Sequence, residues 1–113
     1  MRANKYNARK VQQDGYTFDS KREAARYGEL KLLVCAAEIS ELTVHPKFIL
    51  TQAFLWHGKH ERAIKYIGDF MYREGSTWVV EDVKGGRATQ TAAFRIKAKL
   101  FKLYFPEYDF RIV

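Results

Sequence analysis

The spacing of hydrophobic and polar residues divides the chain into two helices and several short strands. Apolar residues recur three and four positions apart in two segments, which predicts amphipathic helices at residues 20–37 and 89–104. Shorter apolar runs, bounded by glycine, proline and polar residues, predict strands at residues 44–54, 63–72, 77–84 and 108–113. This order of elements predicts an α/β fold with a mixed central sheet flanked by two helices.

Local signals sharpen the ends of several elements. Asp14-Gly15 lies between two short strand-like runs and predicts a small N-terminal hairpin. Ser20, followed three residues later by Glu23, matches a capping box at the start of the first helix. Pro106 predicts the end of the second helix.

Composition limits the class of protein. The chain has 113 residues, of which 47% are hydrophobic, so it is large enough for one globular domain. We expect that domain at residues 11–113, after a basic flexible arm at residues 1–10. No apolar run approaches the roughly 20 residues of a membrane span, and the first residues lack the pattern of a signal peptide. With a single cysteine, Cys35, these features predict a cytoplasmic protein (in the host cell, if phage-encoded) with no membrane partner and no small-molecule cofactor.

The formal net charge of +7 favours a polyanionic partner, although a basic surface also suits a membrane or mere solubility. The cations gather in two blocks, one before the first acidic residue and one after the strand at 77–84. If DNA is the partner, the expected contacts are Arg2, Lys5, Arg9, Lys10, Arg87, Arg95, Lys99 and Lys102. A solvated helix face is the alternative interpretation for the last three.

Two adjacent strands carry the candidate chemistry. Asp82 and Lys84 are two residues apart, so they share a strand face, and hairpin pairing brings Asp69 beside them. Carboxylates inside apolar strands are costly to bury without a partner, and Mg²⁺ prefers such hard oxygen ligands. The Val83 carbonyl lies between them as a further oxygen ligand. Glu81 points to the opposite face and is only a second-choice ligand, while a solvated hairpin with mixed charges is the alternative.

Glu23 is the candidate for a third carboxylate. On a helical wheel it shares a stripe with Tyr27, Leu30 and Val34, so it faces the core near the start of the first helix. The same residue is also explained by the capping box, in which its side chain bonds back to the Ser20 N–H. The local pattern leaves both interpretations open.

The histidines give a weaker signal. His57 and His60 lie in a glycine-containing turn at residues 56–60, but no cysteine or third histidine completes a zinc site. A solvated turn therefore explains them better. His45, directly before Pro46, is expected to be structural.

The segments that carry a family resemblance are Phe18-Asp-Ser-Lys-Arg-Glu23-Ala24, Tyr27, Glu29-Leu30, Ile39, Pro46-Lys47-Phe48, Ile67-Gly68-Asp69-Phe70 and Asp82-Val83-Lys84-Gly85. Together they resemble a small, mostly phage and prophage family of the PD-(D/E)XK, restriction-endonuclease-like nucleases, and are similar to nuclease subunits of some transposition systems. The resemblance implies an αβββαβ core. It implies Glu23, Asp69 and Asp82 as ligands of Mg²⁺ or Mn²⁺, and Lys84 as catalytic. The chain departs from the motif at Gly68, where the family has proline.

The expected function is therefore a metal-dependent endodeoxyribonuclease that hydrolyses DNA phosphodiester bonds. The chain has no room for a separate sequence-reading domain, which favours structure-directed cutting of branched DNA, of the Holliday-junction type, in phage DNA recombination or processing. Cutting two strands would take a homodimer. The alternatives are a sequence-specific restriction-type nuclease, a non-catalytic nucleic-acid-binding protein on the same fold, and an interaction protein with structural carboxylates.

Overall fold

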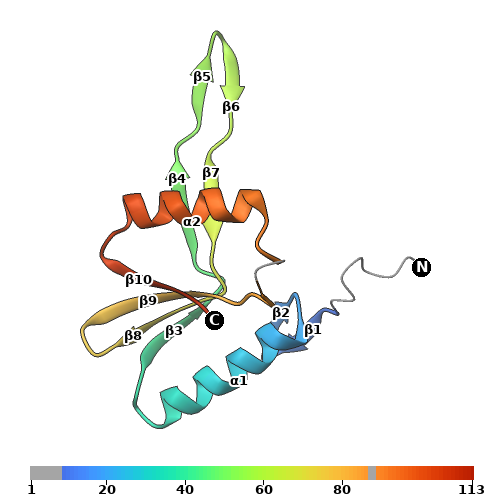
Figure 1. The fold of residues 1–113 in the computed structure, drawn as a ribbon, viewed down its shortest axis with the longest axis vertical. Coiled ribbons are helices and arrows are strands. Elements are labelled where there is room, and N and C mark those ends of the chain that lie inside the picture. The colour runs from blue at the N-terminus through green and yellow to red at the C-terminus, as the bar shows by residue number, and fades with distance from the viewer. Residues whose placement is uncertain (1–8, 87–88) are drawn as a thin grey trace.

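The computed structural model describes residues 9–86 and 89–113 and has a mixed α/β architecture (Figure 1). The strands are β1 (Val11–Gln13), β2 (Tyr16–Phe18), β3 (Ser40–Val44), β4 (Lys47–Thr51), β5 (Phe54–Trp56), β6 (Lys59–Glu61), β7 (Ile64–Ile67), β8 (Phe70–Glu74), β9 (Thr77–Asp82) and β10 (Tyr108–Ile112), and the helices are α1 (Lys21–Cys35) and α2 (Ala92–Tyr104). The predicted hairpin and both predicted helices are confirmed. Ser20 caps α1 through its side chain, which accepts from the Glu23 N–H, and α2 ends before Pro106.

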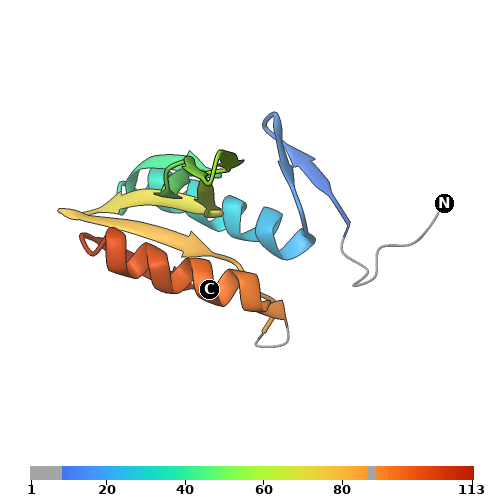
Figure 2. The ribbon, with the colours of Figure 1, turned by 90° about the horizontal axis from the view of Figure 1, so that it is seen from above.

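The main sheet has the strand order β10-β9-β8-β3. Strands β3, β8 and β9 form an antiparallel meander, and β10 pairs with β9 in parallel after the crossover through α2. Helices α1 and α2 cover opposite faces of this sheet (Figure 2). The expectation of a mixed sheet flanked by two helices is therefore confirmed.

Strand β9 is buried on both faces, as its apolar sequence predicts. Val79 belongs to the core on the α1 side, with Leu30 and Tyr72, whereas Val80 belongs to the core on the α2 side, with Phe101. Both valines are fully buried. Side chains placed on β9 therefore reach one of two separate protein interiors, according to their parity.

The predicted strands at 44–54 and 63–72 are wrong in extent, because both bend at the same level. The first breaks at His45-Pro46, between β3 and β4, and the second at Gly68, between β7 and β8. The His45 N–H donates to the Asp69 carbonyl and the Gly68 N–H donates to the Pro46 carbonyl, each at 2.9 Å, so the strands stay paired through the bend. Pro46 has no N–H to continue a ladder, and a Cβ on Gly68 would lie 3.1 Å from Val80 Cγ1.

Beyond the bend, the chain forms a projecting arm, which we define as residues 47–67. Its base pairs β4 with β7, and its end pairs β5 with β6 around a turn at His57-Gly58 (Figure 1). The arm lengthens the molecule to 53 Å along its longest axis. Neither helix of the described residues combines the length and the hydrophobicity needed to span a bilayer.

Candidate metal centre

Three potential ligands from three elements meet at the bend. Glu23 near the start of α1, His45 after β3 and Asp69 before β8 each offer a ligand atom, and these atoms lie within 4.8 Å of one another. The apolar stripe of α1 brings Glu23 there. Glu23, Tyr27 and Leu30 are buried as expected, whereas Val34 at the far end of the stripe is exposed. The predicted proximity of Glu23 and Asp69 is confirmed, and we call the three residues the bend cluster.

Glu23 realises only half of the capping box. Its backbone N–H donates to Ser20 Oγ at 3.1 Å, but its carboxylate lies 2.9 Å from His45 Nε2. The side chain thus leaves the helix terminus and faces the bend. The Glu23 carboxylate thus lies where a third ligand would be needed, and Glu23 is 5% exposed.

The sequence pattern did not predict that His45 would lie in the bend cluster. Its backbone has a φ of 55°, a left-handed conformation that non-glycine residues seldom adopt, and this directs its ring toward Glu23. The hydrogen bond from the His45 N–H to the Asp69 carbonyl helps to hold that conformation. The available signal in the sequence was a histidine directly before a proline at the end of a strand, which marks a bend but not the direction of its side chain.

Asp69 is the most perturbed carboxylate of the centre. Its side chain accepts a hydrogen bond of 2.6 Å from the Val83 N–H, and its own N–H donates to the Glu81 carbonyl at 3.0 Å. The pKa of Asp69 is raised to about 8, chiefly by burial and then by the negative charges of Asp82 and Glu23, while the Val83 hydrogen bond and the Lys84 ammonium lower it in part. A cation would relieve both the desolvation and the repulsion.

Asp82 and Lys84 share a strand face, as predicted, and form an ion pair of 2.9 Å. The second Asp82 oxygen accepts a hydrogen bond of 2.6 Å from the Tyr66 hydroxyl. Burial, followed by the negative charge of Asp82, raises the pKa of that hydroxyl above its usual range. Asp82 is therefore engaged on the α2 side and is not one of the three groups whose ligand atoms converge. It still acts on Asp69 through its charge, more strongly than Glu23 does.

Lys84 borders the centre from the α2 side. Its ammonium lies 4.1 Å from the centre of the Phe94 ring, a cation–π contact that fixes it at the start of α2. Lys84 also lines a cleft of about 320 Å³ beside the bend cluster. The cleft is lined by Asp19, Ser20, Arg22, Glu23, Asp69, Val83, Lys84, Gly85 and Thr89. Lys84 and two of the candidate ligands, Glu23 and Asp69, thus line one accessible space.

Glu81 points away from Asp82, as predicted, and belongs to a different cluster. The Arg26 guanidinium donates two hydrogen bonds to it, of 2.8 and 2.6 Å, and the Tyr72 hydroxyl donates a third. Glu81 is fully buried, and the pKa of Tyr72 is raised to about 12, by burial first and then by the bond to Glu81. We call Arg26, Tyr72 and Glu81 the sealed cluster, because its carboxylate has no face open to a ligand.

The remaining predicted contact residues are spread over the surface. Arg2, Lys5 and Arg87 lie outside the described residues, and Arg9 and Lys10 are exposed before β1. His57 and His60 lie at the end of the arm and not at the bend cluster. Among the described residues, they belong to no group of three or more potential metal ligands.

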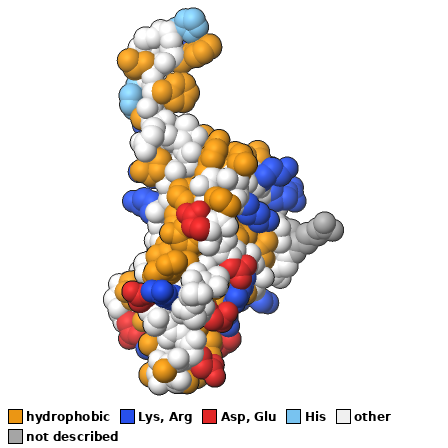
Figure 3. Space-filling model, turned by 90° about the vertical axis from the view of Figure 1, so that its left-hand side faces the viewer, with side chains coloured by type: hydrophobic (Ala, Val, Ile, Leu, Met, Phe, Trp, Pro, Cys, Tyr) orange, Lys and Arg blue, Asp and Glu red, His pale blue; other side chains and the backbone are white. Residues whose placement is uncertain are grey.

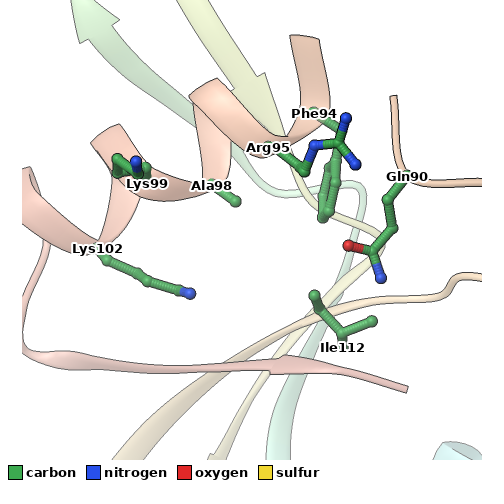
Figure 4. A pocket seen from close by; sticks show the side chains of 7 residues that line it. All are labelled: Gln90, Phe94, Arg95, Ala98, Lys99, Lys102 and Ile112. Atoms are coloured by element: carbon green, nitrogen blue, oxygen red, sulfur yellow. The ribbon is translucent and has the colours of Figure 1, made fainter. Parts of the chain in front are cut away.

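Arg95, Lys99 and Lys102 do form one row on α2. They line a groove of about 310 Å³ between α2 and β10, with Gln90, Phe94, Ala98 and Ile112 (Figure 4). Lys102 reaches into the gap between the helix and the strand (Figure 4), and its ammonium lies 5.5 Å from the centre of the Phe110 ring. Phe94 also contacts Lys84, so this basic groove adjoins the candidate centre.

The fold and the bend cluster define a mixed α/β protein with one polar centre between a helix terminus and a bent strand pair. Comparison with known families places the chain in the family described as "Protein of unknown function (DUF1064)", which it matches over residues 3–113. The chain thus belongs to that family. A comparison with curated proteins found no match.

Proposed function

We propose that this protein is a divalent-metal-dependent endodeoxyribonuclease of the restriction-endonuclease-like class. The observation that carries the proposal is the convergence of Glu23, His45 and Asp69, two of which line an open cleft together with Lys84. The order helix, three-stranded meander, helix and parallel strand supports an αβββαβ core in which the arm is an insertion between the first and second strands. Gly68 fits this reading, because proline there would remove the N–H that bonds the Pro46 carbonyl.

The residues present suit Mn²⁺ or Mg²⁺. Glu23 and Asp69 offer hard oxygen ligands, Val83 borders the same cleft with its carbonyl as a further candidate, and His45 adds a nitrogen. Imidazole suits Mn²⁺ better than Mg²⁺, so we propose Mn²⁺ as the stronger activator. A bound divalent ion supplies Lewis-acid polarisation of the scissile phosphate.

Lys84 and Asp82 act together in this proposal. Lys84 donates to the attacking water or to the phosphate oxygens as negative charge develops on them. Asp82 and Phe94 hold the ammonium at that position, through the ion pair of 2.9 Å and the cation–π contact of 4.1 Å. Asp82 thus becomes a positioning residue and a second source of negative charge beside Asp69, rather than a ligand of the bend cluster.

The groove on α2 gives the DNA backbone a path. It continues from Lys84 past Phe94 to Arg95, Lys99 and Lys102, and phosphates in it would be held by charge without base contacts. Binding of this kind favours recognition of DNA structure over DNA sequence.

The test is cleavage of supercoiled, linear and four-way-junction DNA with Mg²⁺, Mn²⁺ or EDTA. We expect cutting with Mn²⁺ above Mg²⁺, none in EDTA, and loss of cutting in Lys84→Ala. Lys31→Ala is the matched control, because it also breaks a lysine–aspartate pair, with Asp14, but far from the bend. DNA binding without cutting in either metal would favour the non-catalytic alternative, and cutting at one duplex sequence would favour a restriction-type enzyme.

His45 gives the metal assignment a separate test. We expect His45→Ala to reduce the preference for Mn²⁺ over Mg²⁺, because the nitrogen ligand is lost while both carboxylates stay. Isothermal titration with each metal measures this without cleavage. An unchanged preference would return His45 to the structural role that its sequence context suggested.

A further inference from the structure

The end of the arm exposes large apolar side chains. Phe54, Leu55 and Trp56 are 50%, 70% and 61% exposed, and together they make up strand β5. Hydrophobic and histidine side chains gather at this end of the molecule, whereas acidic side chains gather toward the other end (Figure 3). Phe54 and Trp56 lie on one face of the ribbon and Leu55 on the other, so both faces expose large apolar groups, which indicates a contact with another molecule.

The charges around these residues select the kind of partner. Glu61 is the one acidic residue between 47 and 67, against Lys47, Lys59, Arg62 and Lys65. Trp56 is opposite Lys59 and Ile49 is opposite Lys65, whereas Phe54 is opposite Glu61. Like charges would repel two arms from one another, whereas a polyanion with flat apolar groups complements both features.

We propose that the arm binds unpaired bases of DNA, with Trp56 and its neighbours stacked on the bases and Lys59, Arg62 and Lys65 on the phosphates. Aromatic side chains between cations form the usual platform for single-stranded nucleic acid, because every base offers a face for stacking. Trp56 is suited to this role, since it is 61% exposed and meets the His57 ring in a T-shaped contact, at 4.4 Å between ring centres, rather than in a stacked one. The inference rests on DNA being the substrate, and it narrows that substrate to branched or partly single-stranded DNA.

The geometry sets the distance between this contact and the candidate centre. The arm leaves the body at the bend itself, where His45 bonds to Asp69, so the centre lies at its root. The ten residue-to-residue steps of extended chain from Lys47 to His57 reach about 30 Å. At about 3.4 Å per base pair, the unpaired bases lie roughly nine base pairs from the cleaved phosphate.

Tryptophan fluorescence reports on the tip directly. The chain has two tryptophans, so Trp78→Phe leaves Trp56 as the reporter and Trp56→Phe leaves Trp78, which is half-buried under Arg73. In EDTA, where no cutting is expected, we expect forked DNA to quench Trp56 strongly and blunt duplex to quench it little, with Trp78 nearly unchanged. Equal quenching by forked and blunt DNA, or quenching confined to Trp78, would overturn the assignment.

Affinity gives an independent measurement. Leu55→Ala combined with Trp56→Ala should weaken binding to forked DNA about tenfold or more, with little effect on blunt duplex. Leu32→Ala is the control, because Leu32 on α1 is 71% exposed and remote from the arm. Unchanged affinity in the arm variant would overturn the inference even if the wild type cuts DNA. If the arm variant loses affinity for forked DNA as expected but the wild type cuts no DNA with any metal, the inference stands and the nuclease proposal is rejected.

The oligomeric state tests the competing occupant. If the arm instead joined two copies of the chain, the wild type would sediment as a dimer without DNA and the Leu55→Ala, Trp56→Ala variant as a monomer. That result would overturn the assignment to DNA. If the wild type and the variant have the same mass in solution without DNA, the assignment to DNA is supported.

Discussion

The bend cluster and the sealed cluster each withdraw carboxylates from water beside the same sheet, yet the groups that surround those carboxylates differ. In the sealed cluster, Glu81 is fully buried and receives three hydrogen bonds, two of them from the cation Arg26. In the bend cluster, Asp69 is also largely withdrawn from water, but the charges that act on it most strongly are those of Asp82 and Glu23, and its pKa is raised to about 8, chiefly by burial.

Glu81 illustrates how this fold accommodates a buried carboxylate that has only a structural role. Such a group receives a guanidinium and a phenol, and its negative charge is compensated inside the protein. In the bend cluster, Asp69 accepts a backbone hydrogen bond from Val83 and is only partly compensated by Lys84, and the cluster adjoins a cleft. The sealed cluster is thus an internal control, and it supports the interpretation of the bend cluster as a place for a cation.

Removing one charge from each cluster should separate function from stability. We expect Asp69→Asn to lower the rate of DNA cleavage by about a thousandfold or more, since several kcal/mol of metal-dependent stabilisation are lost. The variant should stay folded, with unchanged circular dichroism. Calorimetry should show the binding of Mn²⁺ weakened in parallel. Normal binding and cutting in Asp69→Asn would remove the contrast between the clusters.

The reverse result is expected for the sealed cluster. Arg26→Ala leaves Glu81 buried without its cation, which should destabilise the protein by about 3 kcal/mol. The loss is measured as a lower urea midpoint. At a temperature where the variant is folded, its cleavage rate should stay within a few-fold of the wild type. A variant as stable as the wild type would show that the Arg26–Glu81 contact in the sealed cluster contributes little to stability.

The pH dependence of stability gives a further test of the contrast between the bend cluster and the sealed cluster. Because the folded pKa of Asp69, about 8, lies above its unfolded value, Asp69 destabilises the metal-free fold progressively as pH rises from about 4 toward 8. In EDTA, Asp69→Asn should therefore gain stability relative to the wild type between about pH 5 and pH 8, by on the order of 1–2 kcal/mol. Thermal unfolding of both proteins across this range measures it. A constant difference would mean that the carboxyl is well solvated.

The smallest effect concerns cations rather than carboxylates. Arg26 is held by a buried acid, whereas Arg95, Lys99 and Lys102 form no ion pair with a described residue. If all three contact phosphate, their joint replacement by alanine should reduce the log–log salt slope of duplex binding by roughly two to three. Replacing Lys31, which already pairs with Asp14, is the control. An unchanged slope would identify the α2 row as a solvated face.

The elements that sequence patterns predicted well are those fixed by local chemistry. Asp14-Gly15 defines the first hairpin, Ser20 caps α1, and the stop at Pro106 limits α2. The bend was not predictable in this way. It depends on Pro46 meeting Gly68, and on the lack of space beside Val80, which are contacts between distant segments.

The candidate site divides along the same line. Periodicity placed Glu23 on the core side, Asp82 beside Lys84, and Glu81 on the opposite face. It could not show that Tyr66 engages Asp82 on the α2 side, because Tyr66 comes from the arm. It also missed His45, whose ring reaches Glu23 only through a left-handed backbone conformation.

The parallel pairing of β9 with β10 has a consequence for the order of events in folding. The segment after β9, which carries Val83 and Lys84, is held by hydrogen bonds between Lys84 and Val113 and between Val113 and Asp82. Parallel pairs need a crossover, so these contacts join residues far apart in the chain and form slowly. A growing chain would present the bend cluster before Lys84 is fixed beside it. If the proposed function is correct, cutting activity would then arise only after β10 has paired with β9.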